Sequence, residues 1–211
     1  YHAKLGRVSG EPLKFIMIQL IEGLQFLKYS NILHLDLKPE NIFLEDNKSY
    51  NIKIGDFGLA KLGNRVQRDF NVQTCWYRSP EVILQNQYSF EADLWSMGLI
   101  ILELIIDKPV FKTRTDDGLY FLMDLFIGPK PNIIRNYNRH LNTKMLNLTQ
   151  PQKYKLQTHL EVIEDAMIDY LPIPLKPLII GILKWSPKKR LTLEECLEII
   201  NEYEPEKPIK R

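Results

Sequence analysis

Apolar side chains recur at helical spacing near the beginning of the chain. Between residues 11 and 30 they stand at Leu13, Ile16, Met17, Leu20, Ile21, Leu24 and Leu27. Steps of three and four residues put side chains on one face of an α-helix, so the pattern predicts an amphipathic helix over residues 11–30. Pro12 suits the first turn of that helix, and Asn31 follows its end, where a left-handed residue is common.

Two short runs of β-branched and aromatic residues come next, Ile42–Leu44 and Ile52–Ile54, with a polar turn sequence at residues 46–49 between them. This pattern predicts a β-hairpin. Residues 55–80 have no regular period and contain Gly55, Gly58, Gly63 and Pro80. A loop of that length in a compact domain is usually functional.

The second half of the chain is predicted to be helical, with breaks at prolines. We expect helices over residues 91–106, 117–127, 175–185 and 192–203, the last capped by Thr192. Residues 128–151 contain Gly128 and several prolines and are expected to form an irregular insertion with short helices. The predicted fold class is therefore mainly α, with one small β-hairpin.

Composition and charge narrow the range of functions. The 211 residues carry 28 Lys and Arg against 26 Asp and Glu, a net charge of +2 that gives no support for nucleic-acid binding. The two cysteines, Cys75 and Cys196, fit reduced thiols of an intracellular protein better than a disulfide framework. The apolar stretch Leu94–Ile106 falls short of the ~20 residues that a membrane span needs, so we expect a buried helix and no membrane partner.

The candidate chemistry lies in the two segments that flank the hairpin. Phosphoryl transfer requires positioning and charge neutralisation more than covalent catalysis. Asp36 could orient a substrate hydroxyl and accept its proton, and Lys38 could offset charge on the transferred group. Asn41 and Asp56 offer oxygen ligands of the kind that Mg²⁺ prefers, and a hairpin between them can return both to one site. Taken singly, the Asp-Lys pair could be a solvated ion pair, and Asp56–Gly58 a simple turn.

Taken in order, these motifs resemble the catalytic lobe of a eukaryotic protein kinase. His34–Asn41, Asp56–Gly58 and Ser79–Glu81 follow the family template H-R-D-L-x-x-x-N, D-F-G and A-P-E. Asp93–Gly98 resembles the central helix motif of the family, and Arg190 stands where the partner of the A-P-E glutamate is expected. The resemblance spans about residues 11–203. It implies a kinase C-terminal lobe over residues 1–211, without the N-terminal β lobe, that takes part in ATP- and Mg²⁺-dependent transfer of phosphate to serine or threonine hydroxyls of protein substrates.

The resemblance also implies roles for single residues. The implied catalytic residues are Asp36, Lys38, Asn41 and Thr74. The implied ATP-binding residues are Lys38, Glu40, Asn41, Phe43 and Asp56, with Phe43 beneath the adenine ring. The implied Mg²⁺ ligands are Asn41 and Asp56. Thr74 is expected to contact Asp36 and Lys38.

Other residues are expected to have structural roles. By resemblance, His34 and Phe57 pack together within the lobe, and Asp93 accepts hydrogen bonds from the backbone of the catalytic loop. Glu81 and Arg190 are expected to form an ion pair that ties the activation segment to the lobe.

The segment Gln73–Leu84 resembles the substrate-pocket segment of the CMGC kinase group, which also carries an insertion where residues 128–174 stand. Leu35 replaces the arginine that most kinases hold there to pair with an activating phosphate. The LAMMER-type (CDC-like), SR-protein and dual-specificity tyrosine-regulated branches commonly lack this arginine, so the chain is placed nearest to them. We hypothesise that the activation segment is ordered without phosphorylation, with Asp69 as a fixed negative charge; the alternative is that Asp69 is simply solvated.

Two elements of a complete kinase are not present in the 211 residues. There is no G-x-G-x-x-G loop and no strand lysine of the V-A-I-K type, since Lys53 precedes D-F-G in the hairpin and is expected to be exposed. The isolated chain is therefore predicted to transfer phosphate negligibly. Because Tyr1 is not methionine, we expect a longer protein in which an N-terminal kinase lobe is the partner. The alternative is a lobe-only binding or scaffold module. Family analogy suggests a location in the nucleus or cytoplasm.

Overall fold

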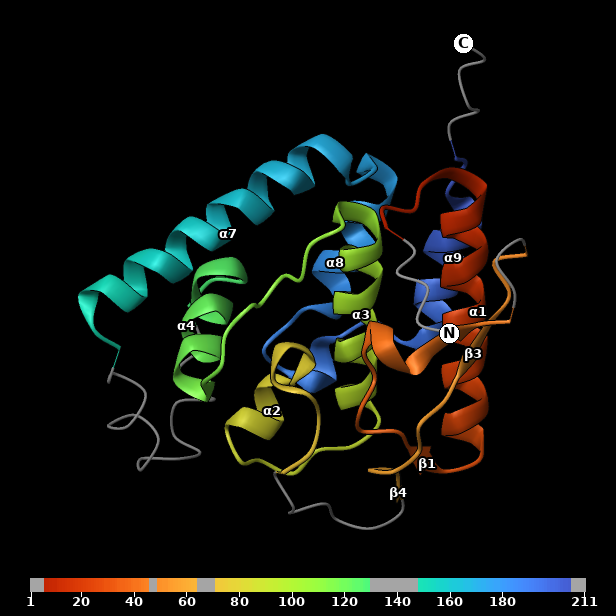
Figure 1. Ribbon diagram of the computed structural model, residues 1–211. Helices are drawn as coiled ribbons and strands as arrows, with labels where there is room; N and C mark the ends of the chain where they lie inside the picture. Colours follow the sequence, from red (N-terminus) through yellow and green to blue (C-terminus); the bar gives the residue numbers. More distant parts are fainter. Residues whose placement is uncertain (1–5, 46–48, 64–70, 130–147, 206–211) are drawn as a thin grey trace.

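The structure is a computed structural model that describes residues 6–45, 49–63, 71–129 and 148–205. Within these ranges it is mainly helical, as predicted, with short strands beside the first helix (Figure 1). The helices are α1 (Gly10–Tyr29), α2 (Pro80–Ile83), α3 (Glu91–Ile106), α4 (Asp116–Phe126), α7 (Gln150–Tyr170), α8 (Lys176–Ile182) and α9 (Leu193–Glu202). The strands are β1 (Ile32–Leu33), β2 (Ile42–Leu44), β3 (Ile52–Ile54) and β4 (Lys61–Leu62), and short 3-10 turns are η1 (Pro39–Asn41), η2 (Cys75–Tyr77), η3 (Ile173–Leu175) and η4 (Pro187–Lys189).

Helix α3 lies at the centre of the lobe and is buried along most of its length. Figure 1 shows α8 behind it, α1 and α9 side by side on one flank, and α4 and α7 on the other. A Cβ on Gly98 would lie 2.5 Å from Cγ2 of Ile182, so a glycine is needed where α3 and α8 approach. The apolar stretch predicted as a buried helix is confirmed as the core of the lobe. Among the helices that the structure describes, none has the length and hydropathy required to cross a bilayer.

Helix α1 confirms the stripe that its sequence predicts. All seven stripe residues are buried, and they pack against α3 and α9. The helix ends at Tyr29, and Asn31 has φ +58°, the left-handed conformation expected after its end. The chain then enters the loop that carries Asp36.

The predicted hairpin is present as the antiparallel pair β2–β3, which pairs Ile42 with Ile54 and Leu44 with Ile52. Most of its turn lies outside the described residues. A second pair, β1–β4, was not predicted. It joins Ile32–Leu33 to Lys61–Leu62, and strands of two residues are too short to show a period in sequence. This second pair joins the chain before the loop that carries Asp36 to the segment after Asp56–Gly58.

The insertion contains a long helix that the sequence did not predict. Residues 130–147 lie outside the described residues, but α7 begins already at Gln150 and runs for 21 residues. Its buried positions are only Leu160, Ile163 and Ala166, so the apolar stripe is too narrow to predict a helix. The local signal was the capping box of Thr149 and Gln152.

The last two helices were predicted with different accuracy. Helix α8 ends at Ile182, three residues earlier than expected, and Leu175 belongs to the preceding 3-10 turn. Helix α9 agrees with its prediction because Thr192 caps it together with Glu195.

Candidate active site

Asp93, in the first turn of α3, holds the loop that carries Asp36 by hydrogen bonds to the loop backbone. The backbone N–H groups of His34 and Leu35 donate to the two carboxylate oxygens of Asp93, over 2.7 and 2.8 Å. Burial raises the pKa of Asp93 to about 7, against the effect of the two hydrogen bonds. Leu35 itself has φ +61°, and its carbonyl accepts from the N–H of Gln73. This left-handed backbone is therefore fixed by partners on both sides.

The carboxylate of Asp36 has a partner on each oxygen. Lys38 Nζ donates to Oδ2 over 2.7 Å, and Asn41 Nδ2 approaches the same oxygen at 3.2 Å. Thr74 donates to Oδ1 from its hydroxyl over 2.7 Å and from its backbone N–H over 3.2 Å. Three side chains from two distant segments thus fix the orientation of one nearly buried carboxylate.

These contacts set the charge of Asp36. Burial, the largest influence, raises its pKa, but the hydrogen bonds from Lys38, Thr74 and Asn41 and the charge of Lys38 together lower the pKa below its ordinary value. The group is therefore an ionised acceptor at neutral pH. Because Asp36 is ionised, it can receive a proton from a bound hydroxyl but cannot supply one.

Thr74 closes a triangle with the other two groups. Besides donating to Asp36, its Oγ1 accepts from Lys38 Nζ over 3.2 Å. The contacts expected of Thr74 are therefore observed, although 38 residues separate it from Asp36 in the sequence. The side chain of Lys38 remains 21% exposed, so it is accessible from solvent.

The hairpin places Asn41 and Asp56 at the same end of its ladder. The N–H of Gly55 donates to the carbonyl of Asn41 over 3.0 Å, and Asp56 follows directly. Asp56 is exposed and has φ +62°, and its Oδ1 accepts from the N–H of Gly58.

Asn41 is buried and donates Nδ2 to the backbone carbonyl and the carboxylate of Asp36, so Oδ1 is the atom it can offer to a ligand. An amide oxygen beside an exposed carboxylate is a donor set that fits Mg²⁺. Their roles as ligands stay predictions.

His34 connects the loop that carries Asp36 to the Asp56–Gly58 turn. Its Nδ1 accepts from the N–H of Asp36, and its Nε2 lies 3.0 Å from the carbonyl of Gly55, which places the ring proton on Nε2. Burial lowers the pKa of His34, so the ring is neutral at pH 7. It packs against Phe57 with 4.9 Å between ring centroids. The expected packing of these two rings is confirmed.

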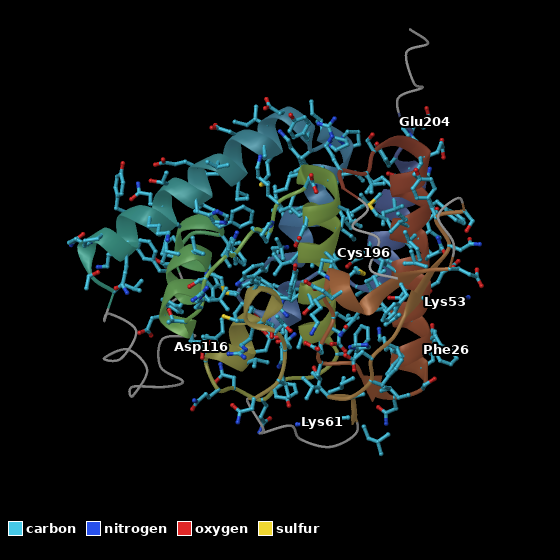
Figure 2. All side chains as sticks on the ribbon, in the orientation of Figure 1. Phe26, Lys53, Lys61, Asp116, Cys196 and Glu204 are labelled. Atoms are coloured by element: carbon cyan, nitrogen blue, oxygen red, sulfur yellow. The ribbon has the colours of Figure 1, made fainter. Side chains whose placement is uncertain are left out.

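The remaining predicted nucleotide-binding residues lie around the hairpin. Phe43 packs on the backbone of Gly55, where an added Cβ would lie 2.8 Å from the ring. Glu40 is exposed in η1. Lys53 is exposed on the outer side of β3 (Figure 2), as predicted for a strand lysine without a site role.

Glu81 and Arg190 form the expected ion pair. Two guanidinium nitrogens of Arg190 contact the two carboxylate oxygens of Glu81 at 2.8 and 2.6 Å, and both residues are buried. The same guanidinium donates to the carbonyl groups of Lys184 and Glu91. The pair therefore joins α2 to α3 and to the segment before α9.

Gln73 is a residue that sequence reasoning missed. It is 4% exposed, has φ +62°, and its amide contacts Ser79, Ser96 and the carbonyl of Ala92. A buried polar side chain without an apolar period around it gives no sequence signal. Its neighbour Arg78 donates to two backbone carbonyls and to Asp116, labelled at the start of α4 in Figure 2.

Comparison with known proteins identifies this arrangement. The family model described as "Protein kinase domain" matches residues 2–200. The chain belongs to the protein kinase domain family. The chain is 30% identical over 188 residues to mitogen-activated protein kinase HOG1 of Gibberella zeae, covering 88% of the chain and 50% of that kinase. It is 32% identical over 191 residues to cyclin-dependent kinase 7 of Caenorhabditis elegans, covering 89% of the chain and 54% of that kinase.

The fold is kinase-like as well. A crystal structure of a kinase domain superimposes with a TM-score of 0.81 at 22% sequence identity, covering 92% of this chain and 66% of the other. The relatives named above are mitogen-activated and cyclin-dependent kinases, both of the CMGC group. The chain spans about half the length of these curated relatives.

Proposed function

We propose that the chain is the catalytic lobe of a serine/threonine protein kinase, which transfers phosphate from ATP with Mg²⁺ to hydroxyls of a protein substrate. The observation that carries the proposal is the carboxylate of Asp36, which stays ionised despite its burial because Lys38, Thr74 and Asn41 donate hydrogen bonds to it. Kinase chemistry needs such a preorganised acceptor beside a positive charge.

Each residue has a defined task in this proposal. Asp36 accepts a hydrogen bond from the substrate hydroxyl and receives its proton as the oxygen attacks phosphorus. Lys38 remains paired with Asp36 and stabilises negative charge on the transferred group. Asn41 and Asp56 would hold Mg²⁺, which supplies charge neutralisation on the phosphates, and Phe43 and Glu40 would border the nucleotide. Thr74 holds the segment Gln73–Leu84, which would contact the substrate, in a fixed position relative to Asp36.

The test uses the full-length product of the gene with ATP, Mg²⁺ and serine- and threonine-containing peptides. Asp36→Asn removes the proton acceptor but keeps the size of the side chain, so phosphate incorporation should fall by about 10²–10⁴-fold. Asp169→Asn, the same change at an exposed position of α7, is the control and should retain full activity. Equal incorporation by the Asp36 variant and the wild type would remove Asp36 from this role.

The second candidate is a lobe-only binding module. It is favoured by the apolar surface of the segment that follows Asp56, in which Phe57, Leu59 and Leu62 are 47%, 40% and 55% exposed. A second lobe would cover such a face, and so would a binding partner. Because an upper clamp on the phosphates is not among these 211 residues, the chain alone is predicted to be inactive or nearly so. If the full-length product transfers phosphate and this activity depends on Asp36, the proposal of a lobe-only binding module is excluded.

The proposed placement of the chain within the CMGC group depends on Leu35. Its side chain is fully buried in an apolar cluster that also contains Val72, Val82, Tyr88 and Ala92, so this position supplies no cation to the activation segment. This supports placement near the LAMMER-type, SR-protein and dual-specificity tyrosine-regulated branches, and an activation segment that is ordered without a phosphate. Asp69, the suggested fixed charge, lies outside the described residues.

Phosphate mapping of the expressed full-length protein tests this regulation. A stoichiometric phosphate at residues 59–78 that switches activity would contradict it. By the same family analogy we propose a nuclear or cytoplasmic location.

A further inference from the structure

A hollow of about 830 Å³ lies on the flank of the lobe formed by the end of α4, the second half of α7, and α8 with the segment that follows it. Its walls are mostly apolar. They include Met167, Ile168, Ile179, Ile180, Leu183 and Trp185. None of the predicted site residues lines it, so this groove is separate from the Asp36 site. A volume of this size accommodates several large side chains.

The helices on both sides of the groove carry exposed isoleucines. Ile168 on α7 is 78% exposed and Ile180 on α8 is 66% exposed, and both line the groove. Ile173, in the turn that joins the two helices, is 77% exposed. Large exposed aliphatic residues gathered on adjacent elements are typical of an interaction surface. A small molecule inside the hollow would leave the outer parts of these side chains in water, whereas a helix lying over the groove would cover them.

The charges around the groove are predominantly positive. Lys176, Lys184 and Lys189 line it, against the single carboxylate of Glu164. Lys176 is at the beginning of α8, and the other two follow its end, so the ammonium groups flank the apolar walls. In the part of the chain that the structure describes, none of the three lysines is ion-paired. An occupant with carboxylates beside its apolar residues would complement this arrangement.

The sequence argues against a segment of the same chain as the occupant. Residues 130–147, which follow the groove residue Pro129, contain Lys130, Arg135, Arg139 and Lys144 and no Asp or Glu. The end of the chain, residues 206–211, contains three basic residues and one acidic residue. Both segments carry the same sign of charge as the groove lysines, so a separate acidic partner is favoured.

We propose that this groove binds an amphipathic helix of a partner protein. The partner helix presents aliphatic residues at positions i, i+3, i+4 and i+7 to the groove, and Asp or Glu on its flanks to Lys176, Lys184 and Lys189. This function is additional to phosphoryl transfer and does not depend on it. It supplies a docking site for a substrate or regulator at a distance from Asp36.

The test uses the full-length gene product and two fluorescent helical peptides of about 18 residues, long enough to form helix. Both peptides carry leucines at positions i, i+3, i+4 and i+7. One peptide has flanking glutamates, and the other has flanking lysines. Fluorescence anisotropy gives the affinities. Trp185 is 6% exposed, lines the groove and donates Nε1 to the carbonyl of Gly128, so its 5-fluorotryptophan ¹⁹F signal, assigned with Trp185→Phe, reports occupation of this site.

The glutamate peptide should bind at least about tenfold tighter than the lysine peptide, with a shift of the Trp185 signal. Lys184→Glu with Lys189→Glu should reverse the preference, and Ile180→Ser should weaken binding by at least about fivefold. Phe26→Ser is the control, because Phe26 is 69% exposed on α1, remote from the groove (Figure 2), and its removal should leave the affinity unchanged.

Four outcomes would overturn the proposal. Equal affinity for the two peptides would remove the charge argument, and an unmoved Trp185 signal would place binding elsewhere. A concentration-dependent dimer that Ile180→Ser abolishes would identify a second copy as the occupant. Binding of dodecanoate without binding of either peptide would identify a small amphiphile as the occupant of the groove.

Discussion

Ser79 donates both its backbone N–H and its hydroxyl to one oxygen, Oε1 of Gln73, over 2.9 and 3.1 Å. The other end of the same amide donates to the carbonyl of Ala92 and the hydroxyl of Ser96. All four contacts are buried. The Gln73 side chain therefore joins the beginning of the segment Gln73–Leu84 to its middle and connects both to α3, directly beside the threonine that contacts Asp36.

Replacing Gln73 should destabilise the lobe although no apolar contact is lost. Gln73→Gly removes the amide without adding backbone strain, because glycine tolerates the positive φ of this position. We expect a loss of about 1–3 kcal/mol in unfolding free energy, because the N–H of Ser79 becomes a buried donor without a partner. Urea denaturation measures the loss. A glycine variant as stable as the wild type would assign the amide no energetic role.

Breaking the ion pair of Glu81 and Arg190 by changing one residue should destabilise the protein more than changing both residues together. Arg190→Met leaves the carboxylate of Glu81 buried without its partner, so we expect about 3–5 kcal/mol of destabilisation, independent of salt. Combining it with Glu81→Gln removes the buried charge and should restore part of that loss. Thermal unfolding of the single and double variants gives the coupling. Additive losses in the double variant would contradict a buried pair.

Sequence reasoning succeeded where a motif or a strong period fixes the structure. The stripe of α1, the apolar run of α3 and the cap of α9 each predicted their helices to within a residue or two. The loop residues His34–Asn41 and the turn Asp56–Gly58 were predicted to meet because a hairpin separates them. The pairing of Gly55 with Asn41 is the physical basis of that prediction.

It failed where structure depends on contacts that are remote in sequence. Helix α7 buries few residues and is held mainly by α4 and α3, so its period is weak. Gln73 is polar and buried, and only the positions of Ser79 and α3 give it partners. The groove beside α8 is a property of three helices together, and a single sequence contains no signal for it.

Gly55 should resist substitution because Phe43 packs against its backbone. In Gly55→Ala the new Cβ would lie 2.8 Å from Cε2 of Phe43, and the ring would have to move. Overpacking of this kind costs about 1–3 kcal/mol, and displacement of the ring should weaken nucleotide binding by the full-length protein.

The control for Gly55 is Gly23→Ala. There the close atom is the terminal δ-carbon of Ile54, which can rotate away, so the loss should be much smaller. Calorimetric titration with ATP and Mg²⁺ compares the two variants. Equal nucleotide affinity in both would mean that Phe43 does not border the nucleotide.

The contribution of His34 to stability should depend on pH. Burial lowers the pKa of His34 below its ordinary value of 6.5, so the unfolded chain takes up a proton at a higher pH than the folded one does. The stability that the neutral ring provides is complete above pH 6.5 and is lost as the pH falls below it. His34→Phe keeps an aromatic ring beside Phe57 but removes the titration.

The difference in unfolding free energy between wild type and His34→Phe should therefore be constant from pH 8 to about 7. Below about pH 7 the unfolding free energy of the wild type should fall relative to that of His34→Phe, by at most about 1.4 kcal/mol per pH unit. The raised pKa of Asp93 has the opposite effect on stability, because the contribution of Asp93 is lost as the pH rises through about 7. Asp93 is present in both proteins, so its effect largely cancels in the difference between them. Urea denaturation between pH 5.5 and 8 measures the difference. A constant difference over that whole range would mean that the ring takes up its proton equally in the folded and unfolded chain.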